Sequence, residues 1–162
     1  MINYRKKNKA AAFTLVELIM VVMFIGVFAT IAVPRMSFSA LFKKKADTAA
    51  MKIVTDLRRT RSLAITNAAN YPQGFELQFK AVPLPVFSTY EIVNSKTGEV
   101  IDSHTTDSDV DVSFSGGSWM FQFEPLGNLK IGSGINLDVE ADGHTFSIEI
   151  ISATGMIEWS ED

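Results

Sequence analysis

The stretch FTLVELIMVVMFIGVFATIAV, residues 13–33, contains a single charged side chain, that of Glu17. At about 1.5 Å of rise per residue, a helix of this length is roughly 31 Å long, which matches a hydrocarbon core of about 30 Å. We therefore expect residues 13–33 to form a transmembrane helix. A carboxylate inside that core costs on the order of 2.5–3.5 kcal/mol, so we expect Glu17 to have a functional role.

The residues on either side of the junction between Ala12 and Phe13 form a recognisable pattern. Residues 1–12 form a short leader with four cations and end on a small residue, and Phe-Thr-Leu-x-Glu then opens the apolar run. This arrangement resembles the class III signal of type IV pilins and type II secretion pseudopilins, although Ala12 stands where the family nearly always has Gly. The resemblance implies that a prepilin peptidase cleaves between Ala12 and Phe13 and that the new amine of Phe13 is N-methylated. It also implies that Glu17 neutralises the amine of a neighbouring subunit in a filament.

The same segment also fits an ordinary secretory signal peptide. The small-x-small sequence Thr30-Ile31-Ala32 would then be the cleavage site, and the mature chain would begin at Val33. That alternative predicts a conventionally secreted β-rich domain that binds a carbohydrate or another ligand, and it leaves Glu17 without a role. The mature N-terminus, Phe13, Val33 or Met1, distinguishes the possibilities.

Beyond the apolar run, the pattern indicates a second helical stretch. Pro34 has no backbone N–H, so we expect a kink or a break near Val33. Small and apolar residues then recur at three- and four-residue steps: Ala46, Ala49, Ile53, Leu57, Thr60, Ala64 and Ala68. We expect an amphipathic upper half of one long helix, with this side packed on a domain.

From Tyr71 onward the period changes to two, which predicts strands. The candidate strands are residues 75–80, 86–93, 110–114, 119–123, 135–140, 145–151 and 156–159. Gly98, Gly143 and Gly155 stand in the turns between them, where a positive φ is easily adopted. We therefore expect an α+β fold in which the helix packs on one or two twisted antiparallel sheets.

Three segments of the soluble part resemble the H-type minor pseudopilins of type II secretion and their minor pilin relatives, the GspH/FimT-like family. They are DLRRTRSLAITNAANY (56–71), the sequence Phe123-Glu124-Pro125-Leu126-Gly127, and ISATGMIEW (151–159). The resemblance implies a pilin-like fold with four parts: a basic leader (1–12), a transmembrane helix (13–33), the amphipathic upper helix (34–70) and a β-rich head (71–162). We expect structural roles for Pro34, Phe123, Pro125, Gly127 and Gly155, because Pro125 presets φ and Gly127 permits a left-handed turn residue.

Charge is unevenly distributed along the chain. Residues 35–61 carry eight cations and two acids, whereas residues 62–162 carry three cations and fifteen acids. We expect the basic helix of one subunit to lie near the acidic head of another, which would pair Lys52, Arg58, Arg59 and Arg61 with Asp102, Asp107 and Asp109. The alternative is that Arg58 and Arg59 bond to the head of their own subunit.

The sequence offers little for catalysis or ligand binding. Cysteine is absent, which excludes thiol catalysis, disulfide exchange and Cys-based zinc sites, and no nucleotide-binding or hydrolase motif occurs. Asp107, Asp109 and Asp111 begin like a calcium loop, but Val112 and Ser118 stand where that loop needs Gly and Glu. We expect a solvated acidic loop there, with an irregular calcium site as the alternative. The acidic head would repel phosphate, so we expect no nucleic-acid binding.

These observations together favour a structural subunit with no enzymatic activity and no cofactor. We expect a minor pseudopilin, anchored once in the bacterial inner membrane with its N-terminus in the cytoplasm and its head in the periplasm. Its implied partners are other pseudopilins or pilins, the prepilin peptidase, the inner-membrane assembly platform and membrane lipid. The alternative within this class is a minor type IV pilin that primes pilus assembly.

Overall fold

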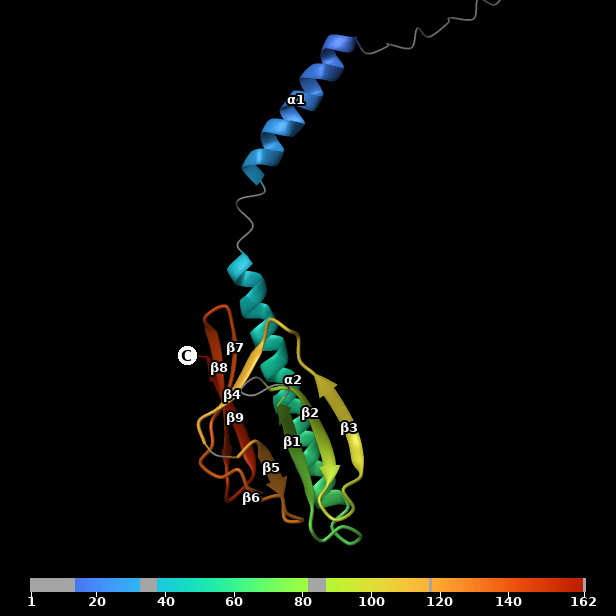
Figure 1. Cartoon of the computed structure of the whole chain (residues 1–162), viewed down its shortest axis with the longest axis vertical. Coiled ribbons are helices and arrows are strands. Elements are labelled where there is room, and N and C mark those ends of the chain that lie inside the picture. The colour runs from blue at the N-terminus through green and yellow to red at the C-terminus, as the bar shows by residue number, and fades with distance from the viewer. Residues whose placement is uncertain (1–13, 33–37, 82–86, 117, 162) are drawn as a thin grey trace, which may run out of the picture. The chain divides into compact units, whose positions relative to one another are not determined.

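The computed structural model describes residues 14–32, 38–81, 87–116 and 118–161, which form two helices and nine strands (Figure 1). The chain divides into two compact units, residues 1–37 and 38–162. We call the second the globular unit. The predicted cleavage residues Ala12 and Phe13, and the predicted break at Val33 and Pro34, lie outside the described residues.

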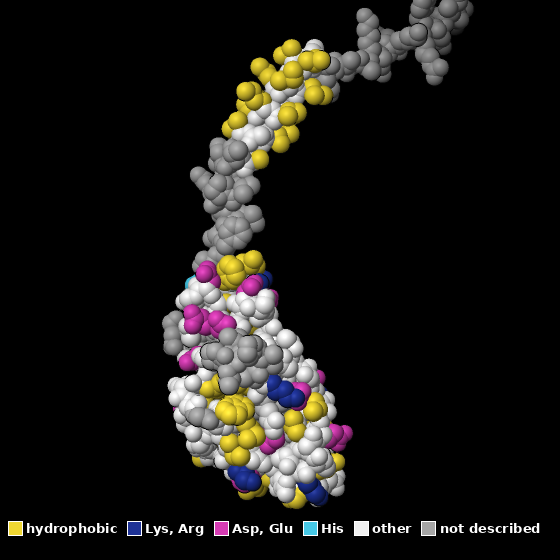
Figure 2. All heavy atoms as spheres, in the orientation of Figure 1, with side chains coloured by type: hydrophobic (Ala, Val, Ile, Leu, Met, Phe, Trp, Pro, Cys, Tyr) yellow, Lys and Arg dark blue, Asp and Glu magenta, His cyan; other side chains and the backbone are white. Residues whose placement is uncertain are grey.

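The first unit contains α1, Leu15–Ala32, which is made almost entirely of aliphatic and aromatic residues. Its large apolar side chains from Leu15 to Phe28 are between 52% and 75% exposed, so apolar surface is exposed all around the helix. Figure 2 shows this apolar surface on the side that faces the viewer. Among the described residues, no helix combines the length and the apolar character needed to cross a membrane.

The globular unit begins with α2, Phe38–Thr66. The residues of α2 that are fully buried are Ala46, Ala50, Ile53, Leu57, Thr60 and Ala64, so the predicted apolar side of this helix does face the core. Of the predicted set, Ala49 and Ala68 are only half-buried, and Ala50 and Val54 are buried in addition. The buried side is therefore wider than the predicted line of residues, as expected for a helix covered by two sheets.

Nine strands form two antiparallel sheets (Figure 1). The bounds are β1 Phe75–Ala81, β2 Phe87–Asn94, β3 Val100–Thr105, β4 Asp111–Phe114, β5 Met120–Phe123, β6 Leu129–Ile131, β7 Leu137–Ala141, β8 His144–Ile151 and β9 Met156–Glu161. The described strands order as β3-β2-β1-β5-β6 in one sheet and β4-β7-β8-β9 in the other. Helix α2 contacts β1 and β5 of the first sheet and β7, β8 and β9 of the second. The predicted α+β class with antiparallel sheets is confirmed.

Two strands, β3 and β6, are not among the predicted ones. Five of the six residues of β3 are exposed and its sequence VIDSHT is largely polar, so it shows no alternation of apolar and polar residues. Strand β6 has only three residues. Both lie at the edges of the five-stranded sheet, where neighbouring strands rather than a buried face of their own hold them.

The predicted glycine turns are present. Gly98, Gly143 and Gly155 have φ values of 72°, 77° and 65°, and Asp142 accompanies Gly143 with a φ of 49°. Two consecutive residues with positive φ are typical of the type I′ turn that joins a tight hairpin, here β7 and β8. The turns at Gly143 and Gly155 join neighbouring strands of the four-stranded sheet, and the turn at Gly98 joins β2 and β3 of the five-stranded sheet.

Candidate functional site

Thr14, which directly precedes α1, and Glu17, in the first turn of α1, hydrogen-bond to each other. The backbone N–H of Glu17 donates to the Thr14 hydroxyl (3.2 Å), and the Glu17 carboxylate accepts from the Thr14 backbone N–H (3.0 Å) and hydroxyl (3.1 Å). This is a capping box, in which two residues at a helix start satisfy each other's backbone donors. The spacing Thr-x-x-Glu is the sequence signal that predicts this cap. The charge of Glu17 alone does not predict it. Glu17 therefore has a partner in its own chain, and both bonds from Thr14 end on the same carboxylate oxygen, Oε2.

Arg61 joins α2 to one turn of each sheet. Its Nε donates to the Gly127 carbonyl and a terminal guanidinium nitrogen donates to the Thr154 carbonyl, both at 2.9 Å. Gly127, with a φ of 83°, closes the turn between β5 and β6 through its N–H bond to the Glu124 carbonyl (2.8 Å). The motif 123–127 and the segment around Gly155 thus meet at the C-terminal end of α2.

The surrounding motif residues complete this junction. Phe123 is fully buried in β5, Pro125 is half-buried in the turn, and Leu126 is 88% exposed. A Cβ atom at Gly155 would lie 1.9 Å from the Gly127 carbonyl oxygen, so the two turns touch through their backbones. The arrangement holds the ends of two sheets against one helix.

A buried carboxylate ties the middle of α2 to β2. Asp56 is 4% exposed and accepts hydrogen bonds from the Tyr90 hydroxyl (2.7 Å) and the Lys52 ammonium (2.6 Å). Burial, together with the hydrogen bond to Asp56, raises the pKa of Tyr90 well above its usual value, so this phenol remains a donor at physiological pH. Sequence reasoning missed this contact. Its only sequence signal is an acid four residues after Lys52 on the apolar side of the helix.

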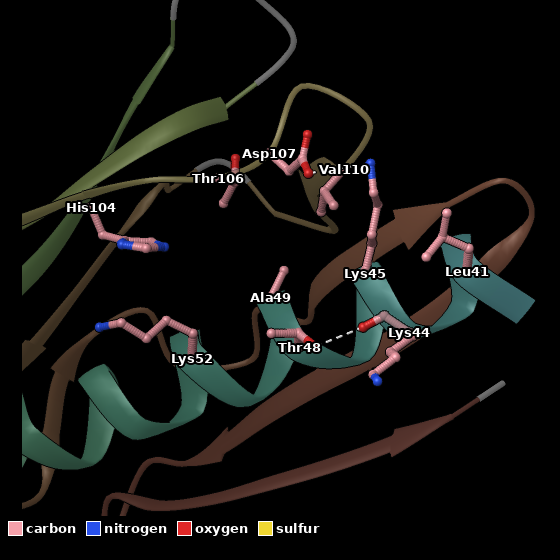
Figure 3. Close-up of a pocket in the computed structure, with 10 residues that line it drawn as sticks. All are labelled: Leu41, Lys44, Lys45, Thr48, Ala49, Lys52, His104, Thr106, Asp107 and Val110. Atoms are coloured by element: carbon pink, nitrogen blue, oxygen red, sulfur yellow. Dashed lines mark hydrogen bonds and ion pairs between the residues drawn. The ribbon is translucent and has the colours of Figure 1, made fainter. Parts of the chain in front are cut away.

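A groove lies between the N-terminal half of α2 and the segment that follows β3 (Figure 3). Its volume is about 530 Å³, and its lining residues are Leu41, Lys44, Lys45, Thr48, Ala49, Lys52, His104, Thr106, Asp107 and Val110. Figure 3 shows Lys45 extending from α2 toward Asp107, whereas Lys44 points away from the groove. The cations beside the groove are therefore not all available to a ligand.

Lys45 occupies the centre of the acidic run that resembles the start of a calcium loop. Its ammonium lies 2.5 Å from an Asp109 oxygen and 3.3 Å from an Asp107 oxygen. The hydrogen bond from Lys45 lowers the pKa of Asp107, and the bonds to Asp109 and Asp107 raise the pKa of Lys45. Asp111 is separate, because it begins β4 opposite Glu140. Within the described ranges, no three acidic or His side chains gather as metal ligands would.

Other cations of α2 also pair within the chain. Arg59 pairs with Asp102 and Lys43 pairs with Glu161. The alternative that Arg59 bonds to the head of its own subunit is therefore confirmed for this residue, and a contact of Arg59 with a second subunit stays a prediction. The reason for these pairings is geometric: α2 lies along the sheets, so Asp102 of β3 and Glu161 of β9 are within reach of its side chains. Arg58, one residue earlier, has no partner in the part of the chain that the structure describes.

The fold was compared with those of known proteins. No family model and no curated protein matches the chain. Two crystal structures of the type IV minor pilin FimU from Pseudomonas aeruginosa match it with TM-scores of 0.54 and 0.56 at 15% identity. The alignments cover 70% and 76% of this chain and 91% and 92% of the FimU chain.

The chain has a pilin-like fold. The alignments leave 30% and 24% of this chain uncovered. The pilin-like fold expected from the sequence resemblance is thus confirmed as an α+β arrangement of a helix on antiparallel sheets.

Proposed function

We propose that this protein is a structural subunit without enzymatic activity that assembles with other pilins or pseudopilins into a filament. The observation that carries the proposal is the combination of a pilin-like globular unit with an apolar α1 that exposes its side chains on all sides. Exposed apolar surface of this extent favours burial against other helices or lipid. A helix of this kind, with Glu17 at its start, suits lateral packing between subunits.

Within this class we propose a minor pseudopilin of type II secretion. The leader and the motifs at 56–71, 123–127 and 151–159 support it, because they resemble the H-type minor pseudopilins. The chain would be inserted once in the inner membrane with its head in the periplasm, cleaved by the prepilin peptidase between Ala12 and Phe13, and N-methylated. Its partners would be other pseudopilins, the inner-membrane assembly platform and lipid.

A second candidate is a minor type IV pilin that primes pilus assembly. The observation in its favour is that the matching crystal structures are described as those of a type IV minor pilin. Deleting the gene in its native host separates the two, because the first role predicts loss of protein secretion and the second predicts loss of pili.

Intact-mass spectrometry of the full chain, extracted from membranes that contain a prepilin peptidase, tests the maturation step. We expect a chain that begins at Phe13 and carries one methyl group. Ala12→Gly is the matched control, since it restores the residue that the family nearly always has. A chain that begins at Val33 would overturn the proposal, and cleavage of the Gly variant alone would show that Ala12 blocks processing.

Two variants of Glu17 separate its roles in the cap and in assembly. Gln keeps an oxygen that can accept the Thr14 N–H but has no charge, whereas Val removes both. We expect both variants to insert in the membrane and both to be lost from the filament fraction, because neither can neutralise a neighbour's amine. Normal incorporation of Glu17→Gln would show that the cap alone is required.

A further inference from the structure

The side of α2 that faces away from the sheets has an unusual composition. Its residues recur at three- and four-residue steps: Leu41, Lys44, Thr48, Met51, Thr55, Arg58, Ser62 and Ile65. We call this the outer face of α2. From residue 41 to the end of α2, no exposed residue is acidic, and Asp47 beside this face is half-buried. Leu41, Met51 and Ile65 are 54%, 48% and 42% exposed.

The polar groups of the outer face of α2 need little water. Thr48 and Thr55 donate their hydroxyls to the carbonyls of Lys44 and Met51, at 2.7 and 2.8 Å. A hydroxyl that is bonded to its own helix can be covered by a partner without losing a hydrogen bond. Thr48 and Thr55 can therefore be buried at a small cost in desolvation.

Lys44 and Arg58 are the charged groups of this face, and neither has a partner in the described chain. The other cations of α2 are bound within the globular unit, to acids or to carbonyls: Lys43, Lys45, Lys52, Arg59 and Arg61. The intrachain pairs thus leave two positive charges directed away from the head, at positions about 21 Å apart along the helix.

The outer face of the four-stranded sheet carries the opposite charge. The register places Asp111 opposite Glu140 and Glu149 opposite Glu158, with Asp138 between these two rows. Carboxylates directly opposite each other on one sheet face repel. Strands β4, β7, β8 and β9 contain no Lys or Arg, and none of these five acids forms an ion pair with either residue within the described ranges.

A hollow on this sheet face can accept a side chain. Its volume is about 320 Å³, and its lining residues include Glu149, Glu158 and Ser160. Two carboxylates on adjacent strands suit a guanidinium, which presents several donors in one plane. The α2 of the same chain cannot reach the hollow, because it packs on the other side of β7, β8 and β9, where the buried residues of these strands lie.

We propose that the outer face of α2 in one copy docks on the outer face of the four-stranded sheet in a second copy, with Arg58 between Glu149 and Glu158. Two different faces of the chain meet, so the contact is heterologous and can repeat in an open-ended assembly. The inference rests on the proposed function, because it requires two copies of this chain to lie next to each other in the filament. The electrostatic contribution to this contact is the neutralisation of Glu149 and Glu158 by Arg58. The apolar surface buried in the contact comes from Leu41, Met51 and Ile65.

Disulfide cross-linking in the full chain tests the contact, since the native sequence has no Cys. One tagged copy carries Thr55→Cys on α2, and a differently tagged copy carries Ser160→Cys on the sheet. We expect an oxidised heterodimer between the two. Thr97→Cys, exposed in the turn between β2 and β3, is the control that should not cross-link to Thr55→Cys. Cross-linking of Thr55→Cys only to itself would overturn the proposal in favour of helix-to-helix packing.

Arg58 and Arg59 are adjacent in the chain, so charge reversal at Arg58 tests the contact and charge reversal at Arg59 is its matched control. We expect Arg58→Glu to lower the cross-linked fraction roughly fivefold or more, and added Glu149→Arg to restore most of it. Arg59→Glu should change the fraction less than about twofold, because Arg59 pairs with its own Asp102. Equal losses from both reversals would overturn the assignment of Arg58.

The inference and the proposed function fail in different ways. Incorporation into filaments without the Thr55–Ser160 cross-link would refute the docking surface and leave the function intact. A cross-link in protein that is never cleaved at Phe13 and never enters a filament would support the docking surface and refute the function.

Discussion

At Gly155 the backbone occupies a position that no side chain can share. Its φ of 65° is left-handed, and a Cβ there would meet the Gly127 carbonyl oxygen, which also accepts a hydrogen bond from Arg61. Glycine is required at this position for two reasons: the backbone has a positive φ, and there is no room for a Cβ atom. By contrast, Gly98 has a similar φ of 72°, and a Cβ at that position would have no other atom within 4 Å.

Alanine substitutions at Gly98 and Gly155 distinguish the cost of a left-handed backbone from the cost of a steric clash of the added Cβ atom. We expect Gly98→Ala to lower the free energy of unfolding by about 1 kcal/mol, the cost of a left-handed alanine. Gly155→Ala should lower it by at least about 3 kcal/mol, because the two turns must also move apart. Urea denaturation of the globular unit measures both. Equal losses would show that the turns separate freely.

Single residues also mark where sequence reasoning failed. The turn glycines and the Pro-x-Gly turn were predictable, since their conformational demands are local. The bond from Tyr90 to Asp56 was not, because it joins residues 34 positions apart whose meeting depends on how α2 lies on β2. The cap formed by Thr14 and Glu17 has a local signal, the spacing Thr-x-x-Glu, which the charge of Glu17 alone does not reveal.

At the scale of elements, α2 is held to the segment after β3 by electrostatic contacts. Lys45 lies between Asp107 and Asp109, and all three groups are at the surface. The pKa of Asp107 is lowered in the folded state, so its contribution to stability is present above its unfolded pKa. That contribution is lost as the pH falls through the folded pKa.

Acid titration of stability tests this contact. We expect the globular unit to lose stability from about pH 5 to pH 2, and the difference between wild type and Lys45→Met to shrink over that window. Lys44→Met is the control, because Lys44 has no acidic partner among the described residues and its removal should leave the acid dependence unchanged. A wild-type-like acid profile for Lys45→Met would contradict the assignment.

Most elements were predictable because each buries one face. Strands such as β7 and β8 alternate apolar and polar residues, and the small residues of α2 recur at helical spacing. Strands β3 and β6 bury little and lack that pattern. The sequence left open whether Arg59 pairs with its own head or with a second subunit, because composition shows complementary charge but not which residues of one chain lie within reach of each other.

At the scale of the whole molecule, the core belongs to one unit. All buried apolar residues of the described chain lie between Ala46 and Ile157, and none lies among residues 15–29 of α1, where burial is described. Helix α2 supplies one wall of this core and both sheets supply the others. The globular unit therefore has everything that its own stability requires.

We expect residues 38–162 to fold without residues 1–37. The isolated globular unit should unfold cooperatively, with a melting temperature within about 4 °C of the full chain in detergent, the shift that about 1 kcal/mol produces at this size. Circular dichroism of both proteins provides the measurement. Loss of a cooperative transition in the fragment would show that the first unit contributes to the core.

The position of β1 has a consequence for how the chain is made. It lies in the centre of its sheet, yet one neighbour, β2, follows it directly, while the other, β5, begins only at Met120. During synthesis, β1, β2 and β3 emerge first, with one side of β1 left as an unpaired edge. A polypeptide interrupted before β5 would present that edge to other nascent chains, so we expect aggregation to be greatest for fragments that stop between β3 and β5.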